Sequence, residues 1–244
     1  MAASLPSIAC IIPTFNRWDF LAQRITELEQ VAREDEGAFT LEIVVVDDHS
    51  NLFCPAPLMR RIYALSGRYL RLHKNSGCVS IPRNVGIANS VSAYIAHIDD
   101  DVKIFPDKFK KLMQCFAEPI DLVYGGLMIE DEAGNTGYSF RKDWNPSLPN
   151  GYGVDGSQFI YRRSVYAKTP LHFPMRGCDW ELAKKIYSGA NFASVDAPVA
   201  VYKWHGGNRS LDPQTKVRPI FPRLYAPYLQ LWDFKIDYNP ISAL

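Results

Sequence analysis

The sequence lacks a glycine-rich motif for cradling phosphate at the end of its first expected strand, where dehydrogenases and P-loop enzymes have one. GxxxxGK[ST] is absent from its 244 residues, and the GxGxxG spacing occurs only at Gly151–Gly156, far along the chain from that strand. Its five cysteines include no CxxC pair, which argues against a disulfide framework and a zinc ribbon and favours a reducing compartment. No apolar run approaches the roughly 18 residues that a membrane span needs. We therefore expect any phosphate group to be bound by other means.

The chain also has almost no excess of charge of either sign. Lys and Arg total 27 against 26 Asp and Glu, a formal net charge of +1. No overall basic field therefore attracts nucleic acid or an anionic membrane surface, and we expect no nucleic-acid partner. With 47% apolar and 13% aromatic residues, the composition is that of a globular protein.

The first residues do not resemble a secretory signal. Residues 1–10 contain no Lys or Arg, and the apolar stretch Ile8–Ile12 is cut short by Pro13. We therefore expect a cytoplasmic protein without a transmembrane segment, while peripheral contact with a membrane stays open.

The first part of the chain alternates buried-strand patterns with amphipathic-helix patterns, as in a βαβ fold. The expected strands are Ile8–Ile12, Leu41–Val46, Arg68–His73 and Ser92–Ile98. The expected helices are Asp19–Arg33, Ser80–Val91 and Pro106–Phe116. The pattern predicts an α/β protein with a Rossmann-like, mixed and mainly parallel central sheet flanked by helices.

After about Asp121 the pattern becomes irregular. Strand-rich stretches cover Asp121–Ile129 and Gln158–Tyr161, and one helix is expected over Asp179–Ser188. We expect a single domain over residues 1–244, with a first half to about 101, a second half over about 102–210 and a Pro- and aromatic-rich tail over about 211–244. The tail either packs over the core or forms an acceptor-binding or oligomer surface.

Polar clusters fall where three expected strands end: Pro13–Arg17, Asp47–Asp48 and Asp99–Asp101. Open α/β sheets bind ligands at the carboxyl ends of their strands, so these clusters are expected to converge on one crevice. Three successive carboxylates repel one another unless a cation is present, and hard oxygen ligands favour Mg²⁺ or Mn²⁺. The alternative is a loop of solvated acids that caps the next helix.

Five blocks, in order, resemble the family-2 glycosyltransferases. The blocks are Ala9–Arg17, Ile43–Ser50, Asn75–Ala88, the Asp99–Asp101 motif, which is similar to the family's DxD, and Gly177–Leu182. The resemblance implies a GT-A fold, a nucleotide-sugar donor, most simply a uridine diphosphate (UDP) sugar, and inversion at the anomeric carbon. It also implies a nucleotide-sugar half and an acceptor half.

The resemblance also implies roles for individual residues. Asp48 would accept from the uracil imide, Asp99 would lie near ribose and metal, and Asp101 would bind the metal directly. Arg83 would lie near base or phosphate. The full set implied to bind the nucleotide sugar is Pro13, Thr14, Asn16, Arg17, Asp48, Arg83, Asp99, Asp100 and Arg209.

The acceptor half contains the expected catalytic base. An inverting transfer needs a carboxylate that takes the proton of the acceptor hydroxyl, and the resemblance gives that role to Asp179. Its neighbour Cys178 departs from the acid that the family commonly has there. Trp180 is expected to form an acceptor platform, and Asp155 either binds sugar or acceptor hydroxyls or shapes a turn.

A late histidine completes the candidate site. His205 precedes a flexible loop that could close over a diphosphate, and it is expected to bind metal or phosphate or to be structural. The sequence thus predicts an inverting, metal-dependent hexosyl-type transferase that acts on a hydroxyl acceptor such as a glycan, a lipid-linked sugar or a small molecule. The alternatives are a sugar-phosphate nucleotidyltransferase and a non-catalytic nucleotide-sugar binding module.

Overall fold

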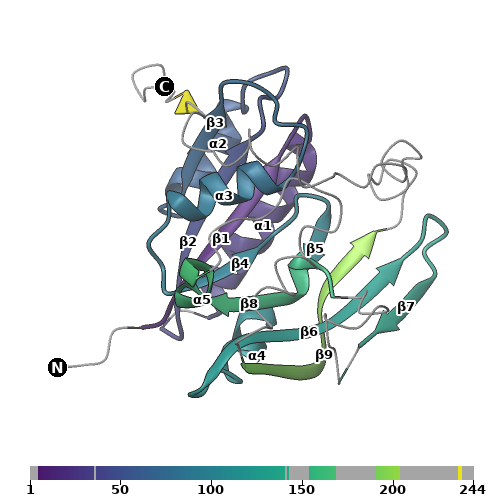
Figure 1. The fold of residues 1–244 in the computed structure, drawn as a ribbon. Helices are drawn as coiled ribbons and strands as arrows, with labels where there is room; N and C mark the ends of the chain where they lie inside the picture. The colour runs from purple at the N-terminus through teal and green to yellow at the C-terminus, as the bar shows by residue number, and fades with distance from the viewer. Residues whose placement is uncertain are drawn as a thin grey trace, which may run out of the picture.

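A mixed β-sheet runs through the computed structural model, which describes residues 5–35, 37–140, 142, 154–168, 191–203 and 236–237 (Figure 1). The strand order is β10-β3-β2-β1-β4-β8-β6-β9-β5, with β7 paired to β6. The strands are β1 Ser7–Thr14, β2 Thr40–Asp47, β3 Arg68–Leu72, β4 Tyr94–His97, β5 Val102–Ile104, β6 Ile120–Glu130, β7 Thr136–Ser139, β8 Phe159–Arg162, β9 Asn191–Lys203 and β10 Ile236–Asp237.

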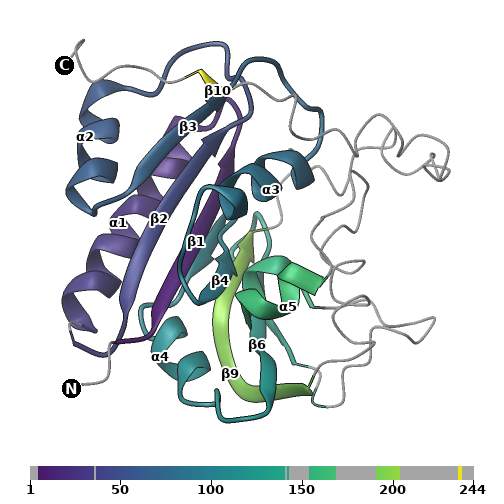
Figure 2. The same ribbon diagram turned by 60° about the vertical axis from the view of Figure 1, so that its left-hand side comes forward.

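Helices cover both faces of this sheet (Figure 2). The α-helices are α1 Trp18–Glu34, α2 Ala56–Ala64, α3 Ser80–Ala88, α4 Lys108–Met113 and α5 Arg163–Lys168, and a 3₁₀ turn, η1, spans Gly156–Gln158. Of these described helices, none combines the length and apolar character that crossing a membrane requires.

The strands β3, β2, β1 and β4 are parallel to one another. They match the four strands expected from the apolar runs, and the run Ile8–Ile12 is fully buried. The alternation along β1 divides the core in two. Cys10 faces a cluster that includes residues of α1, α2 and α4, whereas Ile11 faces a cluster that includes residues of α3 and α5. The mixed α/β architecture expected from the sequence is confirmed.

The helix α3 lies unusually close to β1. A Cβ atom at Gly86 would come within 2.6 Å of Ile11 Cγ2, so only glycine permits this separation without movement of β1. α3 therefore packs directly against β1 at Ile11 and against β2 at Val46.

The chain after β4 extends the same sheet with antiparallel pairs. β8 lies between β4 and β6 and is antiparallel to both, and β5 is antiparallel to β9. The two strand-rich stretches predicted from the sequence are β6 and β8. β9 runs parallel to β6 with irregular register around Gly125 and Gly126. Both parts of the chain therefore contribute to one continuous sheet.

Some elements differ from the sequence-based expectation. α2, β5, β7 and α5 were not expected, because each is short or has a weak periodic pattern. α3 ends at Ala88 rather than at Val91, since side chains from β2, β3 and α5 bind the turn that follows it. The helix expected over Asp179–Ser188 lies outside the described residues, as does the tail apart from β10.

Candidate functional site

The ends of β1, β2 and β4 meet at one edge of the sheet, as expected for parallel neighbours. Thr14 closes β1, Asp48 directly follows β2, and the acidic triplet begins two residues after β4. The backbone N–H of Asp48 donates to the carbonyl of Thr14 at 2.8 Å, and Thr14 Oγ1 donates to Asp100 Oδ2 at 2.8 Å. The three polar clusters of the sequence are therefore in direct contact.

Asp48 is held as a hydrogen-bond acceptor by the loop between β3 and α3. Its Oδ1 accepts from the backbone N–H of Ser76 at 2.8 Å, and its Oδ2 accepts from Ser76 Oγ at 2.9 Å and from Asn75 Nδ2 at 3.2 Å. The side chain is buried. Asn75 and Ser76 belong to a block that the sequence singled out without giving these two residues a role.

Asp47 supports the loop that carries Asp48. It is fully buried, and it accepts from Tyr69 Oη and from the backbone N–H of Ser50, at 2.7 and 2.8 Å. Arg71 Nε lies 3.5 Å from Asp47 Oδ2, the oxygen that accepts from Tyr69. The two neighbouring aspartates thus have different roles. Asp47 forms hydrogen bonds inside the fold, whereas Asp48 borders the candidate site.

The loops after β1 and β2 fix each other through Asn16. Its backbone N–H donates to Ser50 Oγ at 2.8 Å, and its side-chain oxygen accepts from the N–H of Asn51 at 2.7 Å. Asn16 and His49 both have positive φ, at 57° and 66°. Asparagine tolerates this left-handed conformation better than most residues, which explains its place in the loop. Pro13, buried in β1, pairs in register with Val46 of β2.

Arginine side chains balance the charge of the acidic triplet. Arg83 Nη2 lies 2.7 Å from Asp99 Oδ1. Arg17 Nη1 lies 3.1 Å from Asp100 Oδ1 and 2.6 Å from Asp101 Oδ2. From the sequence alone, the mutual repulsion of these carboxylates suggests that a cation is needed. In the structure, two guanidinium groups already offset that repulsion.

The three carboxylates have different environments. Asp100 is buried, and burial raises its pKa to about 7 despite the nearby charge of Arg17 and the hydrogen bonds from Thr14 and Arg17. Asp99 and Asp101 are partly exposed, with 22% and 17% of their side-chain surface accessible. Of the three carboxylates, only the outer two are therefore accessible from solvent.

The outer carboxylates fit part of a site for a hard divalent cation. Each uses one oxygen for an arginine, and within the described residues the second oxygen of each has no protein partner. Carboxylate oxygens are the ligands that Mg²⁺ and Mn²⁺ prefer. The described ranges do not bring together three or more His, Cys, Asp or Glu side chains as a metal site. Two ligands of suitable chemistry are thus present.

Asp155 caps a turn on the second part of the sheet. Its side chain accepts from the N–H of Ser157 at 2.8 Å and forms a reciprocal capping box with Gln158. The fully buried Lys108 of α4 donates from Nζ to the carbonyl of Ser157 at 2.5 Å. Burial lowers the pKa of this ammonium to about 8. The turn role considered for Asp155 is observed, and its contact with an acceptor stays a prediction.

Four predicted residues lie outside the described residues: Asp179, Trp180, His205 and Arg209. The site described above is therefore the part formed by β1, β2, β4 and the first turns of α1 and α3.

Two comparisons with known proteins agree with this arrangement. The sequence is 32% identical over 165 residues to poly(ribitol-phosphate) beta-N-acetylglucosaminyltransferase TarP of Staphylococcus aureus, covering 67% of this chain and 42% of that protein. It is 27% identical over 143 residues to GalNAc(5)-diNAcBac-PP-undecaprenol beta-1,3-glucosyltransferase of Campylobacter jejuni, covering 56% of this chain and 42% of that protein. The chain thus spans less than half the length of either relative.

Solved structures share the fold. S. aureus TarS superposes with a TM-score of 0.66 and 17% identity, over 81% of this chain and 37% of that one. TarS 1–349 in complex with UDP-GlcNAc superposes with a TM-score of 0.64 and 22% identity, over 82% of this chain and 59% of that one. A mannosyltransferase from Pyrobaculum calidifontis in complex with GDP-Man and Mn²⁺ superposes with a TM-score of 0.62 and 15% identity, over 82% of this chain and 57% of that one. The fold is the GT-A fold expected from the sequence.

A match to a protein-family model identifies the family of this chain. The model for Glycosyl transferase family 2 matches residues 9–170, which include most of β1, Asp48, Arg83 and the acidic triplet. The matched range contains four of the five sequence blocks and ends before Gly177–Leu182. The family that the blocks resemble is confirmed, and the chain belongs to glycosyl transferase family 2.

Proposed function

We propose that this protein transfers a sugar from a UDP-sugar to a hydroxyl acceptor with inversion at the anomeric carbon. The observation that carries the proposal is the convergence of Asp48, Arg83 and the Asp99–Asp101 triplet on one edge of the sheet. Family membership and the complex of a structural neighbour with UDP-GlcNAc support a nucleotide-sugar donor. UDP-GlcNAc is accordingly the first donor to test.

Base recognition is assigned to Asp48. Three donors from Asn75 and Ser76 favour its charged, acceptor-only form, which suits a ligand edge that donates. Uracil presents such a donor at its imide N–H, whereas cytosine has an acceptor at the same position. The proposal therefore predicts discrimination between uridine and cytidine nucleotides.

The diphosphate is assigned to the outer carboxylates and to the arginines beside them. Asp101 and Asp99 would hold a divalent cation, with His205 as a further ligand. When bound, such a cation stabilises the negative charge of a departing diphosphate. Arg17 and Arg83 keep Asp101 and Asp99 oriented at the strand end, and Arg209 is proposed to contact phosphate.

The chemical step needs a base on the opposite face of the sugar. Asp179 is proposed to take the proton of the acceptor hydroxyl as that oxygen attacks the anomeric carbon, while the diphosphate leaves. Trp180 and Asp155 are proposed to border the acceptor. Family relatives are named for acting on poly(ribitol-phosphate) and on an undecaprenol-linked glycan, so both kinds of acceptor merit testing.

A thermal-shift screen tests the proposed donor. A ligand that binds only the native state raises the unfolding temperature. UDP-GlcNAc and UDP should raise it with Mn²⁺ or Mg²⁺ present, and CDP should raise it less. A protein stabilised equally by UDP and CDP would contradict the role of Asp48.

Catalysis requires a separate readout. Release of UDP in the presence of an acceptor distinguishes a transferase from a non-catalytic binding module, and release of pyrophosphate would indicate a nucleotidyltransferase. A β-linked product from an α-linked donor would support inversion.

A further inference from the structure

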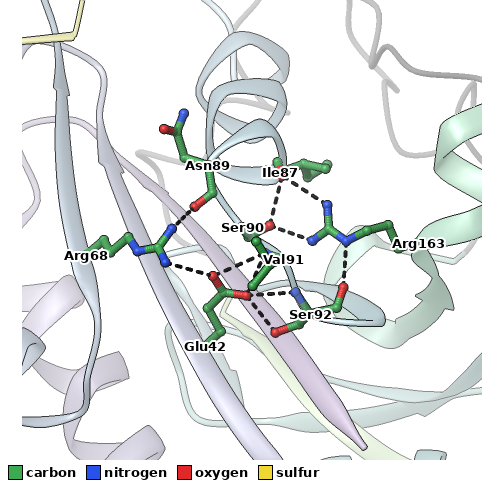
Figure 3. Close-up of polar contacts among 8 residues, drawn as sticks. All are labelled: Glu42, Arg68, Ile87, Asn89, Ser90, Val91, Ser92 and Arg163. Carbon is green, nitrogen blue, oxygen red and sulfur yellow. Dashed lines mark hydrogen bonds and ion pairs between the residues drawn. The ribbon is translucent and has the colours of Figure 1, made fainter.

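The short helix α5 contacts α3 at two separate points. At the first, the guanidinium of Arg163 binds the end of α3 and the turn after it (Figure 3). It donates to the carbonyls of Ile87 and Ser92 at 3.1 and 2.6 Å, and to Ser90 Oγ at 2.7 Å. The Ile87 carbonyl also accepts from the backbone N–H and the Oγ of Ser90, at 3.2 and 2.9 Å, so Arg163 adds to the bonds that close the carboxyl end of α3.

The same turn is bound from its other side by the sheet (Figure 3). Glu42 of β2 accepts from the N–H groups of Val91 and Ser92, each at 2.9 Å, and Arg68 of β3 donates to the carbonyl of Asn89. Although burial disfavours its charge, hydrogen bonds from Ser92 and Val91 keep the pKa of Glu42 below its usual range. The carboxyl end of α3 is therefore anchored to β2, β3 and α5.

The second contact lies nearer the site. Tyr166 Oη donates to Asn84 Oδ1 at 2.7 Å, joining residues 82 positions apart in the sequence. Asn84 is buried, and burial raises the pKa of Tyr166, so the phenol keeps its proton and acts as the donor. With the carboxyl end of α3 anchored by Arg163, this bond limits movement of the middle of the helix.

The residue next to Asn84 belongs to the site. Arg83 is 1% exposed, and its guanidinium forms the 2.7 Å ion pair with Asp99. Adjacent residues of a helix move together, so any rotation of α3 that displaces Asn84 also displaces Arg83. Gly86 already brings this helix into contact with β1, which leaves little room for a different position.

We propose that Tyr166 is a positioning residue for the donor site, and that it acts through Asn84 to hold Arg83 against Asp99. The inference rests on the proposed function for its effect on donor binding. Tyr166 belongs to the part of the chain expected to bind the acceptor, and residues 169–190, which include Asp179, follow α5 directly in the sequence. The bond thus links the two parts of the proposed site.

The direct test is Tyr166→Phe, which removes only the hydroxyl. We expect the Kd for UDP with Mn²⁺ and the KM for the donor to rise roughly three- to ten-fold, the scale of one lost hydrogen bond, while kcat stays within about two-fold. Tyr138→Phe is the matched control. Tyr138 is an exposed residue of β7, and its Oη donates to Asp196 Oδ1 of β9 at 2.8 Å. Unchanged UDP affinity in Tyr166→Phe, or an equal change in Tyr138→Phe, would overturn the proposal.

A double-mutant cycle tests the route through Asn84. If Tyr166 acts through Asn84, Tyr166→Phe should add no further loss of UDP affinity in the Asn84→Ala background. Losses that add fully in the double variant would show that Tyr166 acts by another route and would overturn the assignment.

Hydrogen exchange provides a readout that does not depend on a nucleotide. In the ligand-free protein, the amides of α3 should exchange faster in Tyr166→Phe than in the wild type or in Tyr138→Phe. Wild-type protein that binds no nucleotide would contradict the proposed function, and the exchange of α3 would still decide the positioning role. Identical exchange in all three proteins would overturn it.

Discussion

Arg17 and Asp101 form an ion pair with 2.6 Å between Nη1 and Oδ2, and the same nitrogen also contacts Asp100. One guanidinium from the start of α1 thus balances two carboxylates that follow β4. Because the side chains of Arg17 and Asp101 are 31% and 17% exposed, the pair borders solvent, where a ligand can reach it. The charge balance of the site accordingly exists before any ligand binds.

Asp101→Asn should remove the metal-dependent part of UDP binding and leave the fold intact. Asparagine keeps the shape and can still accept from Arg17, but it lacks the negative charge that a divalent cation needs. Calorimetry with UDP should show an affinity that Mn²⁺ no longer increases. Asp107→Asn is the matched control, since Asp107 is an exposed acid whose carboxylate pairs with Lys111 at 2.7 Å. If Mn²⁺ strengthens UDP binding equally in Asp101→Asn and the wild type, the metal assignment is wrong.

Asp48→Ala should reduce the preference for uridine over cytidine nucleotides. The buried carboxylate accepts from Ser76 and Asn75, and its removal takes away the acceptor assigned to the uracil imide. The ratio of Kd values for CDP and UDP should fall about ten-fold or more, the scale of a lost charged hydrogen bond. A ratio equal to that of the wild type would place base recognition elsewhere.

Tyr69→Phe should destabilise the protein. The change leaves the fully buried Asp47 without one of its donors. We expect the free energy of unfolding in urea to fall by about 1–3 kcal/mol. Tyr138→Phe, at an exposed bond, should change it by less than about 0.5 kcal/mol. Equal effects of the two substitutions would show that burial of Asp47 has no special cost.

The stability contribution of Lys108 should rise with pH. Burial lowers its pKa to about 8 in the folded protein, against 10.5 for the unfolded chain. Between these values the unfolded chain holds a proton that the folded protein has released, so alkaline pH favours folding through this residue. The titratable or charged groups acting on it are Cys10, Asp155, Asp99 and Glu27.

Comparison with Lys108→Met cancels the contribution of the groups that do not interact with Lys108, because those groups titrate alike in both proteins. The free energy of unfolding of the wild type minus that of the variant should increase by roughly 2–3 kcal/mol from about pH 7.5 to about pH 10.5. Urea unfolding at several pH values measures it. A difference that is constant with pH would mean that Lys108 keeps its usual pKa in the fold.

The sequence predicted the features that depend on local pattern. The run Ile43–Val46 indicated a buried parallel strand, and Asp48 and Asp99–Asp101 were expected at strand ends because such runs stop there. The partners of these residues could not be predicted. Ser76 reaches Asp48 only through the conformation of a loop.

Long-range contacts account for the other misses. Tyr166 bonds to a residue 82 positions away, and the short helix that carries it gives little periodic signal. The sequence also proposed a cation to relieve the acidic triplet, without foreseeing that Arg17 and Arg83 would pair with it. Charge pairing between separate elements follows from the fold and has no local signature.

The measurement that tests the proposed mechanism most directly is UDP release by Asp179→Asn, with UDP-GlcNAc, a working acceptor and saturating Mn²⁺. Asparagine preserves the shape of the side chain but cannot take the acceptor's proton. The account predicts that turnover falls by about 10² or more, the range expected on loss of a positioned general base, while the Kd for the donor changes by only a few-fold. Near-normal turnover would contradict Asp179 as the base, and a large loss of donor binding would show that Asp179 shapes the nucleotide site instead.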